Sequence, residues 1–224
     1  MYTETAAPAG LRSVVRCRWR SVEDAPKRIV PDGCLDLVAG AGEVFVAGPD
    51  TAAWTSVAGP GVVQRGLRFV PGQASRVLGV AADELRDERV PLRDLWGRHQ
   101  EERLLAGAVS LTDLVVEHWD PGAEPDRAVA ELLARLHNGA PRVRAAMGQL
   151  AVSERQLRRR FTQAVGYGPA TYLRVARLQR AIALAPRTPG LASLAAAAGY
   201  ADQAHLSRDC RELTGLTPRS FFPR

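Results

Sequence analysis

One pattern occurs twice in the last third of this 224-residue chain, and it restricts the fold there more than any other feature. In the first copy, residues 142–165, an apolar stripe at helical spacing is followed by a short turn and a second amphipathic segment. The stripe is formed by Val143, Ala146, Met147 and Leu150. Apolar residues three and four positions apart share one face of a helix. Residues 142–165 are therefore predicted to form two helices joined by a tight turn.

The turn and the second helix of this first unit have local signals of their own. Ala151-Val152 is predicted to turn the chain, and Ser153 with Gln156 three residues later fits a capping box. Leu157, Phe161 and Val165 then recur at four-residue spacing and are expected to face the core. The residues expected to project on the other faces of this helix are Arg155, Arg158, Arg159 and Thr162.

The second copy of the pattern covers residues 191–215. Its apolar stripe is Leu191, Leu194, Ala195 and Ala198, and Gly199-Tyr200 is the predicted turn. The second helix is predicted over Asp202–Leu213, with Leu206, Cys210 and Leu213 facing inward. Between the two units, Pro169 can begin a helix that continues to about Leu184. A helix of that length spans about 22 Å and is suited to hold the two units apart.

Charge is unevenly distributed along the chain. Residues 141–224 hold fourteen arginines, no lysine and four acidic residues, a net charge of +10, whereas residues 1–140 hold 16 basic and 20 acidic residues, a net charge of −4. This asymmetry indicates that one half meets a polyanion. An Arg-dense helix after a short turn suits the major groove of DNA, where guanidinium groups reach guanine edges or phosphates. The alternative is a solvated basic surface.

These residues resemble a known family. Residues 141–222 are similar to the AraC/XylS-type DNA-binding domain of bacterial transcription regulators. The matching segments are Ser153–Phe161, Gly166–Leu173, Arg177–Ala181, Leu194–Arg208 and Thr214–Phe221. The resemblance implies two reading helices. It places base contacts on Arg155, Arg158, Arg159 and Thr162 in the first and on Gln203, Ala204, His205, Ser207 and Arg208 in the second, with Arg211 as a phosphate contact.

The sequence departs from the family pattern at three places. Cys210 stands where the family usually has Phe, Ala151 replaces the usual turn Gly, and Ala146-Met147 replaces a Leu-Ala pair. A cysteine is smaller than a phenylalanine, so Cys210 is expected to fill the core of the second unit less completely. Cys210 itself is expected to be a packed apolar residue. Four further arginines are left open between phosphate contact and a solvated side chain: Arg160, Arg174, Arg177 and Arg180.

The front of the chain has a different pattern of apolar and turn residues. Short apolar segments at Leu11–Trp19, Arg28–Val30, Cys34–Ala39, Val44–Ala47 and Val62–Phe69 alternate with Gly- and Pro-containing turns, which is typical of a sheet or small barrel. Helical spacing begins near Gln73, and Leu104–Trp119 and Arg127–His137 are predicted to be helices that cover the sheet or serve dimerisation. We therefore expect an α+β chain with a β-rich domain over residues 1–139, helical from about 100 to 138, and a DNA-binding domain over residues 140–224.

A second resemblance covers residues 11–97. Segments 28–38, 46–51, 66–74 and 94–97, which include Pro31-Asp32-Gly33-Cys34-Leu35-Asp36-Leu37, are similar to a β-rich domain attached to some AraC-type regulators. The resemblance implies a cupin-like half barrel followed by helices, and it does not fix the chemistry of a ligand.

Strand alternation suggests where a small-molecule effector could bind. Cys34, Asp36 and Val38 are expected on one face of a strand, and Leu35 and Leu37 on the other. The residues proposed to line an effector pocket are Trp19, Arg28, Cys34, Asp36, Trp54, Arg65 and Arg68. The alternative for this group is a satisfied Asp36–Arg68 ion pair beside a structural cysteine.

Other features narrow the function. The chain has no apolar run long enough for a membrane span and no signal peptide at its start, and Cys17, Cys34 and Cys210 match neither a disulfide framework nor a zinc spacing. We therefore expect a cytoplasmic protein without metal or other cofactor. No catalytic constellation is apparent, so an enzyme is not expected.

The leading hypothesis is a sequence-specific transcription regulator whose front domain modulates DNA binding through an effector or through self-association. The alternative is a DNA-repair type of methyl acceptor that uses Cys34 and is fused to the same DNA-binding domain. A regulator that works by dimerisation alone is the third hypothesis. The partners considered are double-stranded promoter DNA, a small-molecule effector, RNA polymerase and a second copy of the chain.

Overall fold

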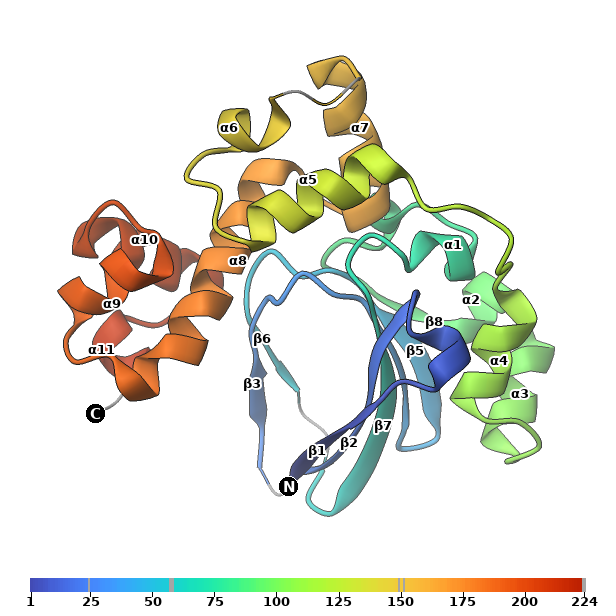
Figure 1. Ribbon diagram of the computed structural model, residues 1–224. Coiled ribbons are helices and arrows are strands. Elements are labelled where there is room, and N and C mark those ends of the chain that lie inside the picture. Colours follow the sequence, from blue (N-terminus) through green and yellow to red (C-terminus); the bar gives the residue numbers. More distant parts are fainter. Residues whose placement is uncertain (24, 57–58, 149, 151, 223–224) are drawn as a thin grey trace.

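Six antiparallel strands form the main sheet of the front part, and a separate two-stranded sheet lies opposite it (Figure 1). The computed structural model describes residues 1–23, 25–56, 59–148, 150 and 152–222. Within them the main sheet has the order β1-β2-β7-β4-β5-β8, and β3 pairs with β6. The strands are β1 (Tyr2–Ala6), β2 (Val15–Glu23), β3 (Lys27–Ile29), β4 (Asp36–Gly40), β5 (Glu43–Ala47), β6 (Trp54–Ser56), β7 (Val62–Phe69) and β8 (Arg89–Pro91).

The two faces of the main sheet differ in polarity. Leu37 on β4 and Leu67 on β7 are buried in the core of the front part. Their chain neighbours Asp36 and Arg68, which pair across the two strands, lie on the opposite face and line a cavity. The predicted β-rich front part and the predicted alternation along residues 34–38 are both confirmed. The sequence did not indicate β1, β6 or β8, because none of them has an alternating apolar pattern and β1 is exposed along its whole length.

Short helices close the apolar face of the sheet, as Figure 1 shows on the side away from β3 and β6. They are η1 (Ala9–Leu11), α1 (Ser75–Leu78), η2 (Ala82–Leu85), α2 (Leu92–Trp96), α3 (Arg98–Leu105) and α4 (Leu111–His118). The prediction of one helix over Leu104–Trp119 is wrong. Gly107 has a positive φ of 73°, and Ser110 begins a new helix by accepting a hydrogen bond from the backbone N–H of Asp113. The chain therefore breaks between α3 and α4.

The next helix, α5 (Arg127–His137), has the predicted bounds but packs with the rear of the chain. Its buried residues Val129, Leu132 and Leu136 belong to one core with Leu157 and Phe161 of the first helix-turn-helix unit. That core includes α6 (Val143–Met147), α7 (Glu154–Val165) and α8 (Pro169–Leu184). Apolar packing thus assigns α5 to the helical part of the chain.

The second unit forms a smaller core at the far end of α8. It consists of η3 (Ala185–Arg187), α9 (Leu191–Ala198), α10 (Gln203–Thr214) and α11 (Pro218–Phe221). Leu194, Ala198 and Leu206 are buried together against Ala181 of α8. Cys210 is fully buried on the inner face of α10, as the sequence predicted. Among the described residues, no helix combines the length and the apolar character needed to cross a membrane.

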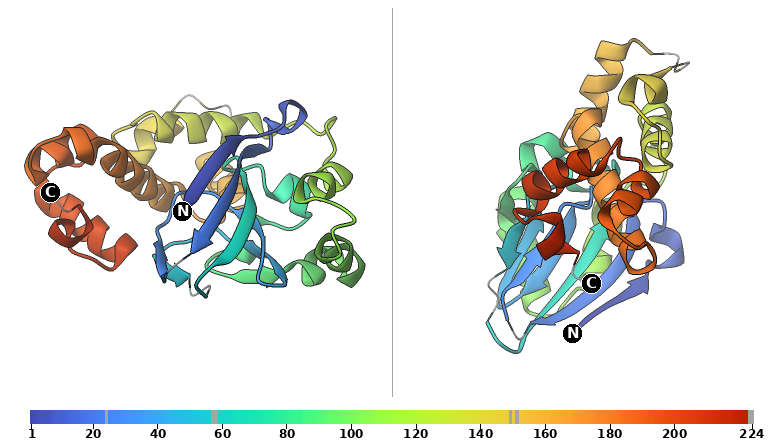
Figure 2. Two further views of the ribbon diagram at one scale, coloured as in Figure 1. Left: turned by 90° about the horizontal axis from the view of Figure 1, so that it is seen from below. Right: turned by 90° about the vertical axis from the view of Figure 1, so that its left-hand side faces the viewer.

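The front and rear parts touch along α7, α8 and the end of α10. The left view of Figure 2 shows the helical part extending from one side of the sheet. Gly166 ends α7 with a φ of 95°, and a Cβ placed there would lie 2.2 Å from Pro49 and 3.0 Å from the carbonyl oxygen of Ala82. A glycine is needed at this position because the front part approaches the backbone so closely.

Candidate DNA-binding helices and ligand cavity

The first reading helix, α7, starts and faces as the sequence predicts. Ser153 caps it by accepting a hydrogen bond from the backbone N–H of Gln156 at 3.3 Å. The predicted capping box is only half formed, because the Gln156 side chain accepts from the Ser153 hydroxyl instead of from the backbone N–H of Ser153. Leu157, Phe161 and Val165 are buried. Ala151, the first residue of the predicted turn, lies outside the described residues.

The residues proposed to contact bases from α7 lie on its outer faces. Arg155 and Arg159 are exposed and, within the described part of the chain, their guanidinium groups have no ion-pair or hydrogen-bond partner. Arg158 is also exposed and pairs with Glu154 one turn earlier at 2.6 Å. Thr162 is half-buried and donates to the carbonyl oxygen of Arg158. Arg155 and Arg159 are therefore the groups of α7 most available to a polyanion.

The second reading helix, α10, is capped by Asp202, which accepts from the backbone N–H of His205 at 2.7 Å. Gln203, Ala204, Arg208 and Arg211 are exposed, and Ser207 is half-buried. The Ser207 hydroxyl donates to the carbonyl oxygen of Gln203 at 2.8 Å, and His205 is held by two other side chains. Its ring packs edge-on against Tyr200 with centroids 5.1 Å apart, and its Nε2 lies 3.7 Å from a carboxylate oxygen of Asp209.

The four arginines that the sequence left open make contacts within the protein. Arg160 pairs with Asp126 at 2.6 Å, and Arg174 pairs with the buried Asp209 at 2.8 Å. Arg177 is 9% exposed and donates to the carbonyl oxygen of Pro141. Arg180 donates to the carbonyl oxygens of Ala198 and His137. These four side chains hold helices together.

Helix α8 connects the two reading helices. It has 16 residues, which at about 1.5 Å each gives a length of about 24 Å. Its buried residues pack against α7 on one side and against α9 and α10 on the other. The two units are thus joined by a continuous helix.

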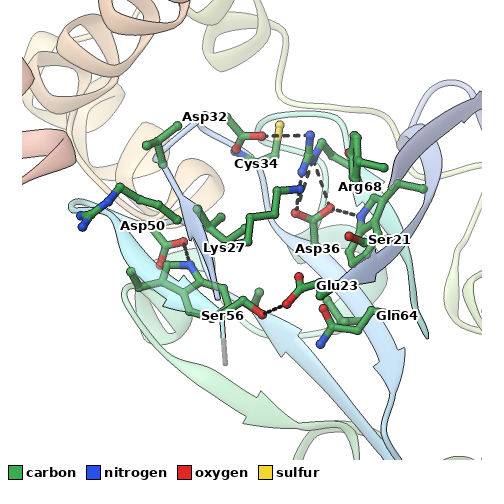
Figure 3. A pocket seen from close by; sticks show the side chains of 18 of the residues that line it. Ser21, Glu23, Lys27, Asp32, Cys34, Asp36, Asp50, Ser56, Gln64 and Arg68 are labelled. Carbon is green, nitrogen blue, oxygen red and sulfur yellow. Dashed lines mark hydrogen bonds and ion pairs between the residues drawn. The ribbon is translucent and has the colours of Figure 1, made fainter. Parts of the chain in front are cut away.

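A cavity of about 280 Å³ lies between the main sheet and the β3–β6 pair (Figure 3). Six of the seven residues proposed for an effector pocket line it, namely Trp19, Arg28, Cys34, Asp36, Trp54 and Arg68. Arg65 does not, because it follows Gln64 and precedes Gly66 on β7, so its side chain points to the other face and is exposed. The two-residue period of a strand could have excluded Arg65 from the predicted pocket on the basis of the sequence alone.

Arg68 and Asp36 form the ion pair that the sequence offered as the alternative. Arg68 Nε lies 3.2 Å from Asp36, and its Nη1 lies 3.2 Å from Asp32 and 3.4 Å from Glu4. Trp19 Nε1 donates to Asp36 at 2.9 Å. Burial raises the pKa of Asp36, and the neighbouring Arg68 opposes this rise. Three carboxylates thus surround one arginine.

Gly66 lets Trp19 occupy its place in the cavity wall. A Cβ at Gly66 would lie 2.3 Å from the indole ring, so the ring rests directly on the backbone of β7. The indole N–H is directed to Asp36 from there. A larger residue at position 66 would move Trp19 away from the sheet.

The thiol of Cys34 is buried at the end of the cavity near Arg68 (Figure 3). Arg16 Nη1 lies 3.8 Å from its sulfur, yet burial raises the pKa of Cys34 well above its ordinary value. Burial also raises the pKa of Cys17, to about 11. Both thiols are therefore neutral near pH 7, whereas a methyl acceptor or a metal ligand needs the thiolate. Among the described residues, no three His, Cys, Asp or Glu side chains are placed to hold a metal ion.

Asp50 and Trp54 form a second polar group at the cavity wall. Trp54 Nε1 donates to Asp50 at 3.0 Å, and Arg89 pairs with the same carboxylate at 2.8 Å while its guanidinium carbon lies 4.0 Å from the centre of the Trp54 ring. Burial raises the pKa of Asp50 to about 6, and Arg89 opposes this rise. Trp54 was predicted from the sequence as a pocket residue, whereas Asp50 was not.

Glu23 and Ser56 were also missed, although both are only 4% exposed. The Ser56 hydroxyl donates to Glu23 at 2.9 Å. Glu23 lies on β2 four residues after Trp19, so the two-residue period of a strand places both on the same face. Extending the predicted strand Leu11–Trp19 by four residues would have found Glu23.

Two protein families match parts of the chain. Residues 147–224 match a family described as "Helix-turn-helix domain", and residues 3–91 match one described as "Domain of unknown function (DUF6597)". No curated protein is significantly similar to the chain.

Solved structures of ToxT from Vibrio cholerae are similar to the chain over nearly its whole length. One has 10% sequence identity and a TM-score of 0.48, and covers 99% of this chain and 97% of that chain. A second, bound to (E)-4-(8-methylnaphthalen-1-yl)but-3-enoic acid, has 10% identity, a TM-score of 0.45 and coverage of 99% and 98%. A third, with an unsaturated fatty acid bound, has 8% identity, a TM-score of 0.44 and coverage of 93% and 89%.

The family matches agree with the order of the parts that the structure shows. The helix-turn-helix match includes both reading helices and α8, and the match of unknown function includes all eight strands and most of the cavity wall. The chain therefore carries a helix-turn-helix DNA-binding domain of the AraC type, preceded by a β-rich domain that matches a family of unknown function.

Proposed function

We propose that α7 and α10 read two successive major grooves on one face of a promoter site. The observation that carries this proposal is the exposure of cationic side chains on both helices, with α8 as a continuous connection between them. Successive major grooves on one face are about 34 Å apart, and α8 together with the widths of the two flanking units covers that distance. The proposed base contacts are Arg155, Arg158, Arg159, Thr162, Gln203, Ala204, His205, Ser207 and Arg208, and Arg211 contacts phosphate.

The cavity of the front part is the proposed effector site. Its wall is connected to the reading helices by hydrogen bonds: Arg28 Nη1 donates to the carbonyl oxygen of Thr214 at the end of α10 at 2.8 Å, and Gln179 of α8 donates to the carbonyl oxygen of Pro31 at 2.7 Å. The backbone N–H of Ala53, next to Trp54, donates to Leu213 at 2.8 Å. A ligand that moves the β3–β6 pair would therefore change how α8 and α10 are held.

The DNA-binding half of the proposal is tested by band shifts with a cognate promoter duplex and a random duplex at several salt concentrations. When a protein neutralises DNA phosphates, the logarithm of its affinity falls linearly with the logarithm of the salt concentration. We expect this slope for both duplexes, with tighter binding to the cognate one. Equal affinity for the two would contradict sequence-specific reading.

The role in DNA binding also bears on the location of the protein, on catalysis, on the domain bounds and on its partners. The protein acts in the cytoplasm, where promoter DNA is accessible, and it is not an enzyme, in keeping with a transcription-factor family and with the neutral state of Cys34. The proposed domains are residues 1–139 and 140–224, and α5 of the first packs into the helical core of the second. RNA polymerase and a second copy of the chain are proposed partners, and analytical ultracentrifugation with and without DNA tests the second of these.

A further inference from the structure

The cavity holds more negative than positive charge. Five carboxylates line it, from Glu4, Glu23, Asp32, Asp36 and Asp50, against three cationic side chains, from Lys27, Arg28 and Arg68. Arg68 is shared among three of the carboxylates. Asp50 is paired with Arg89 from outside the cavity. An anionic ligand would have to enter a space that already carries an excess of negative charge.

Glu23 is the carboxylate that lacks a cation. Its residue is 4% exposed, and its one side-chain partner among the described residues is the neutral hydroxyl of Ser56. No cationic group of the described chain lies within ion-pair distance of it. A buried charge without a partner is costly, and the partner missing here is a cation.

Two further polar groups beside Glu23 have no partner in the described protein. Ser21 is 4% exposed and faces Gln64 across the β2–β7 pairing, and neither side chain makes a hydrogen bond within the described residues. Figure 3 shows Glu23, Ser56 and Gln64 together at the end of the cavity remote from Asp32 and Cys34. Because Ser56 already donates to Glu23 Oε2, the oxygens left to accept are Glu23 Oε1, the Ser21 hydroxyl and the Gln64 side-chain carbonyl, which match the three N–H donors of a primary ammonium group.

Aromatic rings form part of the rest of the wall. Trp19, Trp54 and Tyr2 line the cavity, and two of these rings already hold cations of the protein: Lys27 Nζ lies 4.3 Å from the centre of the Tyr2 ring, and Arg89 stacks on Trp54. Aromatic faces attract cations and also cover apolar groups. The volume of about 280 Å³ is at the small end of ligand pockets, which are about 300–1,000 Å³.

We propose that the effector of this regulator is a small organic ammonium ion, whose charged group reaches Glu23, Ser21 and Gln64 and whose apolar part lies against Trp19 and Trp54. The proposal rests on the proposed function only for the effect of the ligand on DNA binding. The binding chemistry stands on the cavity itself.

Calorimetric titration of the full-length protein tests the ligand class. Three matched probe series are used: butylammonium and 2-phenylethylammonium, their alcohols 1-butanol and 2-phenylethanol, and the acids pentanoate and 3-phenylpropanoate. We expect at least one ammonium ion to bind, and to bind about tenfold or more tightly than its alcohol, as for a charged hydrogen-bond pair. Equal affinity of alcohol and ammonium, tighter binding of the acid, or no binding of either ammonium ion would overturn the proposal.

Two variants locate the charged group. Glu23→Gln keeps the shape of the side chain and removes its charge, and is expected to weaken ammonium binding about tenfold or more while alcohol binding changes little. The control is Glu102→Gln, an exposed glutamate on α3 outside the cavity, which is expected to bind like the unaltered protein. Thermal melting checks that each variant folds. If Glu23→Gln does not fold, Ser21→Ala replaces it, with a smaller loss expected. Unchanged ammonium affinity in the folded Glu23 or Ser21 variant would overturn the assignment.

Band shifts with and without the bound ammonium ion separate this inference from the proposed function. If the ammonium ion binds and DNA affinity does not change, the ligand class stands and the regulatory role of the cavity fails. If only the acids change DNA affinity, the regulatory role stands and the ammonium inference fails.

Discussion

At the scale of single residues, the arginines of the helical part divide by what their guanidinium groups contact. Arg160, Arg174, Arg177 and Arg180 are each held by carboxylates or backbone carbonyl groups of neighbouring helices. Within the described residues, the guanidinium groups of Arg155, Arg159, Arg208 and Arg211 have no such partners. Charge counts alone could not separate the two groups, because the partners come from segments distant in sequence.

Arg159 and Arg160 are neighbours in sequence and make a matched pair of substitutions. Arg159→Ala is expected to weaken binding to the cognate duplex by about 1–3 kcal/mol, roughly 5- to 150-fold, with an unchanged melting temperature. Arg160→Ala removes the contact with Asp126 and is expected to lower stability by up to about 1 kcal/mol with little change in DNA affinity. Band shifts and thermal melting measure the two effects. If Arg159→Ala lowered stability and Arg160→Ala weakened DNA binding, the division of the arginines into two groups would be wrong.

Asp50 makes stability depend on pH in a defined direction. In the folded protein its pKa is raised to about 6, and in the unfolded chain a carboxyl group titrates near about 3.9. The folded state therefore binds more protons between these values, so the contribution of Asp50 to the free energy of unfolding falls as pH rises from about 4 to 6 and is constant above. Urea unfolding of the protein and of Asp50→Asn measures this contribution as a difference. A difference that stays flat from about pH 4 to 6 would show that the pKa of Asp50 is not raised in the folded protein.

At the scale of helices and strands, the sequence predicted what short-range patterns encode. Periodicity, helix caps and Pro169 predicted the bounds of α5 and α8, the inner faces of α7 and α10, and the alternation along residues 34–38. What it missed depends on distant partners. Strand β6 is paired with β3, and α5 belongs with the helical core because Leu132 and Leu136 meet Leu157 and Phe161 in space.

The same division holds for the cavity. Trp19, Cys34, Asp36 and Arg68 were found because they lie on segments with clear strand patterns. Asp50 and Ser56 lie in and near the short strand β6, which has no apolar alternation of its own. Their role becomes visible only when β3 and β6 close the cavity opposite the main sheet.

Gly166 tests the close contact between α7 and the front part. Gly166→Ala forces a residue with a Cβ into a positive φ and into contact with Pro49, and is expected to lower stability by about 2 kcal/mol or more. The control is Gly168→Ala, where φ is −68° and no atom lies within 4 Å of the added Cβ; Gly168 is the N-cap of α8, where Ala is a poorer cap than Gly, so a loss of about 0.5–1 kcal/mol is expected there. Urea unfolding measures both. Equal effects of the two substitutions would show that the contact with Pro49 is not formed in solution.

At the scale of the whole molecule, three segments connect cavity and reading helices. The loop at Pro31, the Arg28 side chain and the residues around Ala53 each make a hydrogen bond to α8 or to the end of α10. Arg155, Arg159 and Arg208 remain exposed while these contacts are made. We therefore propose that the front part alters the relative placement of α7 and α10 without covering the residues proposed to contact DNA.

Methylation interference on the cognate duplex tests the two-helix account most directly, since it detects guanine contacts in the major groove. The account predicts two clusters of interfering guanines on one face, about 10–10.5 base pairs apart, with Arg159→Ala removing one cluster and Arg208→Ala removing the other. A single cluster, or the loss of both clusters in each variant, would contradict it.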